Sequence, residues 1–139
     1  MAVALDSNAV IGFLDSSDPF HEAADKRIRE LLEEGGLLSA SVVTYAEVLA
    51  GAKLGHHDEA AVRGFFVDLI SSVMPVDLAV AERAAELRAE RRSLRMPDAL
   101  ILAGADVDDE VDRIICSDDV ARSVARGLNC KVETLTATK

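Results

Sequence analysis

Four acidic residues stand where segments of regular structure are expected to begin or end: Asp6, Glu47, Asp98 and Asp118. They are separated by roughly the length of a strand and a helix, so they can meet at one edge of a parallel sheet. Functional groups of such sheets lie outside the carboxyl ends of the strands. Clustered carboxylates suit hard divalent cations. The pattern predicts magnesium-dependent phosphodiester chemistry.

Alternating strand and helix patterns would position these acids. Asp6 and Asp118 each follow an apolar strand, Glu47 lies in the first turn of a helix, and Asp98 follows Pro97 at a helix start. This alternation favours one domain over residues 1–139, an α/β/α sandwich with a mostly parallel central sheet of four to five strands. Strands are expected at 2–5, 37–40, 73–76, 113–116 and 131–133, and helices at 10–14, 18–34, 44–54, 57–72, 78–92, 97–105 and from 119 to about 126.

Composition narrows the classes of function. The chain has 139 residues, 50% hydrophobic and 4% aromatic, enough to bury a core in one domain. Its net charge of −10 argues against holding nucleic acid mainly by general electrostatic attraction. A bound cation would invert the local field, so an RNA substrate stays open. The two cysteines form no disulfide pattern, and no leader or membrane segment is recognisable, so we expect a soluble cytoplasmic protein.

Each acid also has a structural interpretation. Asp6 and Asp118 could cap the helices that follow them. Thr44 and Glu47 fit a capping box, and Asp98 could complement a helix dipole. Capping requires no relation among the four residues, whereas a metal site requires them to converge. Converging carboxylates raise one another's pKa unless a cation neutralises them.

Three segments carry a family resemblance. Asp6-Ser7-Asn8 after the first strand, the segment 44–51 (TYAEVLAG) and the segment 97–101 (PDALI) occur in this order. Together with the late acid they resemble the PIN-domain ribonucleases, most closely their VapC toxins. The resemblance covers essentially the whole chain and implies a PIN-like fold.

The resemblance also implies an activity and partners. It implies the toxin of a type II toxin–antitoxin system, an endoribonuclease that uses Mg²⁺ or Mn²⁺. A VapB-type antitoxin would hold it inactive, and the toxin would be a homodimer, in some cases within a larger complex. The RNA phosphodiester would be attacked in line by a metal-activated water.

The residues that match the family's acidic positions are Asp6, Glu47, Asp98 and Asp118. The resemblance implies that the three aspartates hold metal, and that Glu47 is either a ligand or the group that positions and deprotonates the water. Ser7 and Asn8, which follow the first acid, match polar positions that support water or metal.

The fourth acid departs from the family pattern. The family often has Thr or Ser, then two Asp in alternate positions, whereas this chain reads Ser117-Asp118-Asp119-Val120. Shifting the register by one residue would make Asp119 the matching acid. We expect Asp118, with Asp119 as the alternative.

Other charged groups have weaker claims to function. Arg88, Arg91, Arg92 and Arg95 could contact an RNA backbone or form a solvated helix end. The acidic segment 106–112 lacks the Gly and Glu of a calcium loop and is expected to be a surface loop. The three histidines lack a metal-ligand spacing and are expected at polar helix ends.

Two other functions are compatible with part of this pattern. A HAD-like phosphohydrolase would also place an aspartate after its first strand, but that chemistry wants a second Asp two positions later, where this chain has Asn8. A catalytically silent interaction module would use the acids only as caps and would bind no metal.

Overall fold

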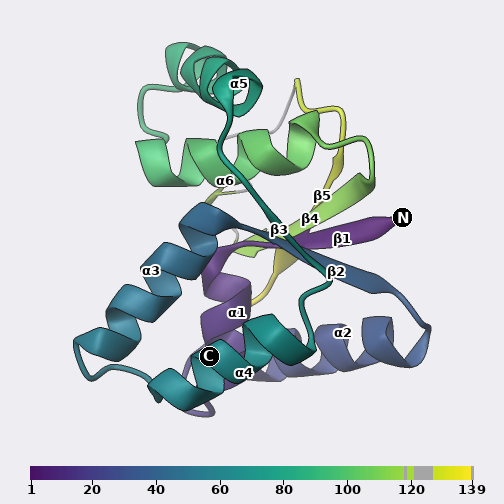
Figure 1. Cartoon of the computed structure of the whole chain (residues 1–139), viewed down its shortest axis with the longest axis vertical. Helices are drawn as coiled ribbons and strands as arrows, with labels where there is room; N and C mark the ends of the chain where they lie inside the picture. The colour runs from purple at the N-terminus through teal and green to yellow at the C-terminus, as the bar shows by residue number, and fades with distance from the viewer. Residues whose placement is uncertain (118, 121–126, 139) are drawn as a thin grey trace.

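A parallel five-stranded sheet forms the centre of the computed structural model, which describes residues 1–117, 119–120 and 127–138 (Figure 1). The strand order is β3-β2-β1-β4-β5, and every neighbouring pair is parallel. The predicted α/β fold with a mostly parallel sheet is confirmed. The strands are β1 (Ala2–Leu5), β2 (Leu37–Ser41), β3 (Ser72–Met74), β4 (Val111–Ser117) and β5 (Lys131–Leu135).

Helices cover both faces of this sheet (Figure 1). Helices α5 and α6 pack together on one face, and α1, α2 and α4 lie on the other. None of the helices in the described ranges is long and apolar enough to cross a membrane. Their bounds are α1 (Ser7–Leu14), α2 (His21–Glu33), α3 (Val42–Lys53), α4 (Glu59–Asp68), α5 (Leu78–Glu90) and α6 (Met96–Val107).

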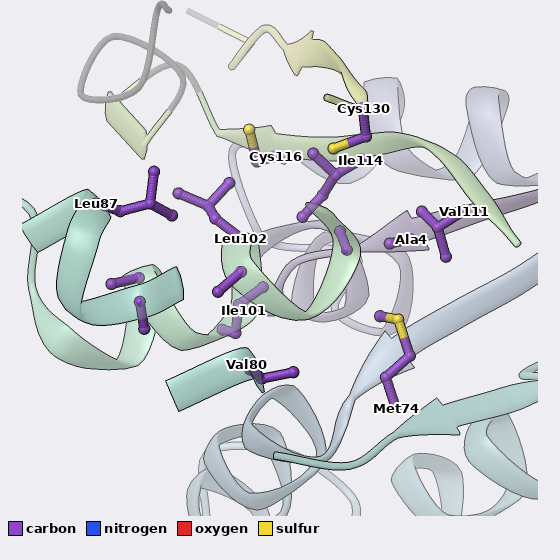
Figure 2. Packing of buried hydrophobic residues seen from close by; sticks show 14 of the residues in the cluster. Ala4, Met74, Val80, Leu87, Ile101, Leu102, Val111, Ile114, Cys116 and Cys130 are labelled. Atoms are coloured by element: carbon purple, nitrogen blue, oxygen red, sulfur yellow. The ribbon is translucent and has the colours of Figure 1, made fainter. Parts of the chain in front are cut away.

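The first strand shows how the sequence builds two cores. Successive side chains of a strand point to opposite faces, so Ala2 and Ala4 join one buried cluster while Val3 and Leu5 join the other. Figure 2 shows the first cluster, in which Leu102 lies among side chains from neighbouring elements. Because both faces are covered, β1 is a continuous apolar run, as expected for a central parallel strand.

Strand register brings the carboxyl ends of three strands together. Leu5, the last residue of β1, pairs with Ala40 on one side and Ile115 on the other. The strand order runs from β1 to β2 and β3 in one direction and to β4 and β5 in the other. A crevice is expected where the order reverses, beyond these carboxyl ends. Asp6 follows β1 at this point.

Most helix starts differ from the sequence prediction by one to three residues, and the differences at α3 and α4 change the interpretation of candidate residues. Helix α3 begins at Val42, where the Ser41 side chain accepts a hydrogen bond from the Val43 N–H. The capping-box interpretation of Thr44 is therefore wrong, because a serine three residues earlier already caps the helix. Glu47 consequently lies in the second turn and not in the first.

Helix α4 was predicted to begin at His57 but begins at Glu59. Its N-cap is Asp58, whose carboxylate accepts a hydrogen bond from the Ala60 N–H at 3.3 Å. Aspartate is a preferred capping residue, so it determines the start of the helix more strongly than the general polarity of the segment. His56 and His57 therefore lie in the connection between α3 and α4.

Candidate active site

Asp6 is a buried carboxylate at the centre of the sheet edge, with 4% of its surface exposed. Its Oδ1 accepts a hydrogen bond from the Ala9 N–H at 2.8 Å, which caps α1. Its Oδ2 accepts one from the Ser117 N–H at 3.2 Å, at the end of β4. The capping role predicted for Asp6 is thus real. The same contacts fix the carboxylate at the crevice between β1 and β4.

Glu47 reaches the same region from α3. Its Oε1 accepts a hydrogen bond from the Ser7 hydroxyl at 2.7 Å, which joins α3 to the first turn of α1. The next residue, Asn8, donates from its side-chain amide to the Ser117 hydroxyl at 3.0 Å. Ser7 and Asn8, predicted as supporting polar residues, therefore hold Glu47 and the end of β4 in place.

Asp98 approaches from the first turn of α6, where its charge complements the helix dipole. Its Oδ2 lies 3.5 Å from Nε of Arg95, and the Asp98 side chain is 22% exposed. This ion pair is solvent-accessible on the arginine side and so contributes little to folding stability. The accessible carboxylate of Asp98 remains available to a ligand in the crevice.

These three acids line one open cleft of about 280 Å³, called here the acidic cleft. Its acids come from three separate elements: the end of β1, the middle of α3 and the start of α6. The structure thus brings Asp6, Glu47 and Asp98 together. The remaining residues of the lining are Ser7, Asn8, Ile11, Gly51, His56, His57 and Arg95.

The electrostatics of the cleft are those of mutually repelling carboxylates. Burial raises the pKa of Asp6 to about 6. Hydrogen bonds from Ala9 and Ser117 oppose this rise in pKa, while the negative charges of Asp98 and Glu47 add to it. Ionisation of a buried acid that has no paired cation near it is energetically unfavourable. A divalent cation bound in the cleft would reduce this energetic cost.

The fourth acid of the sequence prediction, Asp118, lies outside the described residues. Asp119 is described, is exposed, and lines a small cavity together with Arg95 and Asp98. The chain after β4 therefore brings at least one acid to the neighbourhood of Asp98. The choice between Asp118 and Asp119 stays a prediction.

The donor set of the acidic cleft fits a hard divalent cation. All three described acids supply carboxylate oxygens, the donors that Mg²⁺ and Mn²⁺ prefer. Within the described ranges, no group of three or more His, Cys, Asp or Glu side chains is close enough to enclose a metal ion. Mg²⁺ does not need such a cage, because it keeps several waters and binds through one or two carboxylates. Asp6 and Asp98, with Glu47 nearby, are the residues that would hold it.

The arginine cluster divides into structural and accessible members. Arg88 donates to the carbonyl oxygens of Arg92 and Leu94, at 2.5 and 2.6 Å, and so fixes the connection between α5 and α6. Arg91 and Arg92 are exposed. Arg95 is the member that lines the acidic cleft.

The acidic segment 106–112 is not wholly a surface loop, because its first residue is buried. The Asp106 side chain is 1% exposed, and its Oδ2 accepts a hydrogen bond from Nε of Arg83 at 2.9 Å. Its Oδ1 accepts bonds from the backbone N–H groups of Asn129 and Cys130. Asp106 therefore anchors the chain that enters β5 to α6 and α5. A charge that ends a helix is easily mistaken in sequence for part of the following acidic loop.

Sequence reasoning missed two residues of the cleft, His56 and His57. Both were expected at helix ends, but both line the acidic cleft. The available signal was Asp58, which is a strong capping residue and excludes the preceding histidines from the helix. His21, in contrast, has a structural role, because its Nδ1 lies 2.8 Å from the carbonyl oxygen of Gly12.

Comparison with known proteins agrees with this architecture. Among solved structures, VapBC2 from Rickettsia felis bound to a promoter DNA fragment gives a TM-score of 0.74 at 15% identity, covering 98% of this chain and 100% of that one. A toxin–antitoxin complex from Klebsiella pneumoniae gives 0.65 at 27% identity, covering 95% and 96%. Mycobacterium tuberculosis VapC20, described as a Sarcin-Ricin loop cleaving toxin, gives 0.64 at 15% identity, covering 93% and 98%.

Sequence comparison identifies a family but no individual curated relative. No curated protein matches the chain significantly. The PIN domain family matches residues 3–127, a span that includes Asp6, Glu47, Asp98, Asp118 and Asp119. A HAD-like phosphohydrolase would match a different family. The resemblance stated from the sequence is confirmed: this chain belongs to the PIN domain family.

Proposed function

We propose that this chain is the toxin of a type II toxin–antitoxin system and acts as a metal-dependent endoribonuclease. One observation carries the proposal: Asp6, Glu47 and Asp98, from three separate elements, line one cleft at the carboxyl edge of the sheet. Membership of the PIN domain family supports the same activity. A set of helix caps alone would not need to share a cleft.

The chain's own residues supply an ordered site for hydrolysis. Asp6 and Asp98 would hold Mg²⁺ or Mn²⁺, which supplies Lewis-acid stabilisation of the developing negative charge and a more acidic water. The Ser7 hydroxyl donates a hydrogen bond to Oε1 of Glu47. Oε2 of Glu47 is therefore the oxygen left to accept a proton from the attacking water. Asp118 or Asp119 is the fourth acid of this proposal.

Charge explains why RNA would bind here only with a cation. The chain carries −10 overall and the cleft gathers three carboxylates, so the phosphate backbone is repelled from the empty site. Arg95 is the described cation in the cleft lining. We propose that Arg95 contacts the RNA backbone next to the cleaved phosphate. Arg91 and Arg92, which are exposed nearby in the sequence, would extend this contact.

The proposed partners are proteins as well as RNA. Solved relatives include toxin–antitoxin complexes from Klebsiella pneumoniae and VapBC2 from Rickettsia felis. We propose a VapB-type antitoxin as the partner that inhibits this chain, and a homodimer as its own assembly. An acidic toxin is suited to a basic antitoxin segment that enters the acidic cleft in place of the cation.

Cleavage of total cellular RNA by the antitoxin-free protein tests the proposal. Wild type in Mg²⁺ or Mn²⁺ is compared with Asp98→Asn, with EDTA, and with Asp68→Asn, whose exposed acid lies at the far end of α4. We expect discrete cuts from wild type and Asp68→Asn, and a loss of at least about 100-fold in Asp98→Asn and in EDTA. Equal cutting by Asp98→Asn would contradict the site assignment. Folded protein that neither cuts RNA nor binds metal would favour a silent interaction module.

A further inference from the structure

The acidic cleft continues into a second cavity across His56 and His57. This second cavity, called here the adjoining cavity, has a volume of about 220 Å³. The same two histidines line both spaces, so they form the boundary between them. Their rings lie 6.3 Å apart in an edge-to-face arrangement. The rest of the adjoining cavity is lined by Leu14, Asp15, Ser16, Asp58 and Ala61.

His57 is held at this boundary by packing and not by a hydrogen bond of its buried nitrogen. Its Nδ1 is buried and has no hydrogen-bond partner among the described residues. A Cβ added to Gly51 would lie 2.9 Å from the His57 ring, so the absence of a side chain on α3 lets the ring lie against the helix. A histidine with a purely structural role normally pairs its ring nitrogens, as His21 does with Gly12.

Two carboxylates give the adjoining cavity its chemistry. Oδ1 of Asp15 accepts both the Ser17 N–H and the Ser17 hydroxyl, at 2.9 and 2.7 Å. Oδ1 of Asp58 accepts the Ala60 N–H. In both residues these bonds use Oδ1, which leaves Oδ2 to accept a hydrogen bond from a ligand. The hydrogen bonds from Ser17 lower the pKa of Asp15, so this carboxylate is ionised at neutral pH.

These features select a base and not a phosphate. The negative charge of Asp15 repels phosphate groups, whereas an aspartate oxygen accepts hydrogen bonds from the amino group of a base. Leu14 and Ala61 provide apolar surface, and imidazole rings stack on the unpaired bases of single-stranded RNA. Adenine, cytosine and guanine carry an exocyclic amino group, and uracil does not.

We propose that the adjoining cavity binds the base of the nucleotide next to the cleaved phosphate and prefers a base with an exocyclic amino group. This inference rests on the proposed ribonuclease function. The scissile phosphate would lie in the acidic cleft, and the chain of the RNA would pass over the boundary formed by His56 and His57. Sequence preference at that one position of the RNA would then come from Asp15 and Asp58.

Nucleotide binding tests the cavity without requiring cleavage. The probes are AMP, CMP, GMP and UMP, titrated into wild type in Mg²⁺ buffer, and the readout is the NMR signals of the three histidine side chains. We expect AMP, CMP and GMP to shift the His56 and His57 signals with an affinity about tenfold above that of UMP. The His21 signal, from a ring tied to Gly12, should not move.

Matched variants make the result specific. Asp15→Asn and Asp58→Asn should reduce the discrimination against UMP to less than about threefold, since an amide both donates and accepts hydrogen bonds. Asn is also a good N-cap, so the second variant should fold normally. Asp68→Asn should leave the discrimination unchanged. Retained discrimination in both Asp15→Asn and Asp58→Asn would overturn the assignment of these residues.

The outcome is separable from that of the proposed function. RNA cut by wild type without base preference, together with unmoved His56 and His57 signals, would overturn this inference and leave the ribonuclease assignment intact. Nucleotide-dependent shifts with the predicted preference, in a protein that cuts no RNA, would support the cavity and overturn the ribonuclease proposal. Equal binding of all four nucleotides would overturn the base preference.

Discussion

Asp6→Asn should remove the pH dependence that Asp6 contributes to the folding stability. Burial raises the pKa of Asp6 from 3.8 to about 6 in the folded protein, while the unfolded chain keeps the ordinary value. The folded state therefore holds this proton more tightly than the unfolded state. The stabilisation is complete below pH about 4 and is lost as the pH rises to about 6. Ionised Asp6 at neutral pH thus costs folding stability.

The magnitude follows from linkage. A rise from 3.8 to about 6 corresponds to about 3 kcal/mol, at about 1.4 kcal/mol per pKa unit. Asparagine keeps an oxygen for the Ala9 N–H but places an amide donor opposite the Ser117 N–H, which costs about 1–3 kcal/mol at every pH. The absolute stability of the variant therefore combines the loss of the charge with the loss of a hydrogen bond. Only the effect of the charge changes with pH, so the pH dependence of the stability measures that effect alone.

The assay is urea unfolding of both proteins in EDTA at pH 4 and pH 7.5. Subtracting wild type from Asp6→Asn cancels the titration of the other acids. We expect this difference in unfolding free energy to move in favour of the variant by about 2 kcal/mol between the two pH values, because the unfolded carboxyl is already more than half ionised at pH 4. Adding Mg²⁺ at pH 7.5 should then stabilise wild type and not the variant. A difference that is the same at both pH values, or that moves the other way, would refute the electrostatic reasoning.

Other substitutions test separate parts of the structure. Glu133→Gln should lower the free energy of unfolding by about 1 kcal/mol at pH 7, because two partly exposed arginines pair with Glu133 and lower its pKa. This loss of stability, measured by urea unfolding, should fade below pH about 4. Asp106→Asn should cost about 3 kcal/mol by leaving the charge of Arg83 poorly paired, measured by thermal unfolding beside the exposed Asp109→Asn, which should cost almost nothing. Gly51→Ala should change the free energy of unfolding by no more than about 1 kcal/mol. The added Cβ should nevertheless displace the His57 ring and weaken GMP binding several-fold. Unchanged GMP affinity would contradict the packing of His57 against Gly51.

The layout of the sheet was predictable because its strands are short apolar runs with polar ends. The run at Ala2 to Leu5, directly followed by Asp6, gave both a strand and the position of an acid at its carboxyl end. Pro97 likewise marked the start of α6 and placed Asp98 in its first turn. Both signals lie within a few residues of the acid, so the sequence around each acid is enough to place it at the end of its strand or the start of its helix.

Helix starts were less predictable where two capping residues compete. Thr44 and Ser41 are both acceptable caps, and the strand pairing of β2 through Ser41 decides in favour of the serine. Asp58 similarly displaced the start of α4 and left His57 in a loop. These choices depend on where neighbouring strands end, which the local sequence does not contain.

Convergence of the acids was the part of the site that the sequence supported only as an inference. The register of β1 against β2 and β4, together with the packing of α3 and α6, brings Glu47 and Asp98 to the cleft that Asp6 lines. Burial of Asp106 was also unforeseen, because its partner Arg83 is 23 residues away on α5. Long-range pairs of this kind leave no local pattern.

End-group analysis of cleaved RNA in ¹⁸O-labelled water is the most direct test of the central claim that the acidic cleft directs metal-dependent hydrolysis by water. The account predicts that wild type with Mg²⁺ leaves one ¹⁸O atom on each new terminal phosphate and forms no 2′,3′-cyclic phosphate, and that Asp98→Asn leaves the RNA intact. Products ending in 2′,3′-cyclic phosphate, or cleavage that persists in Asp98→Asn, would contradict it.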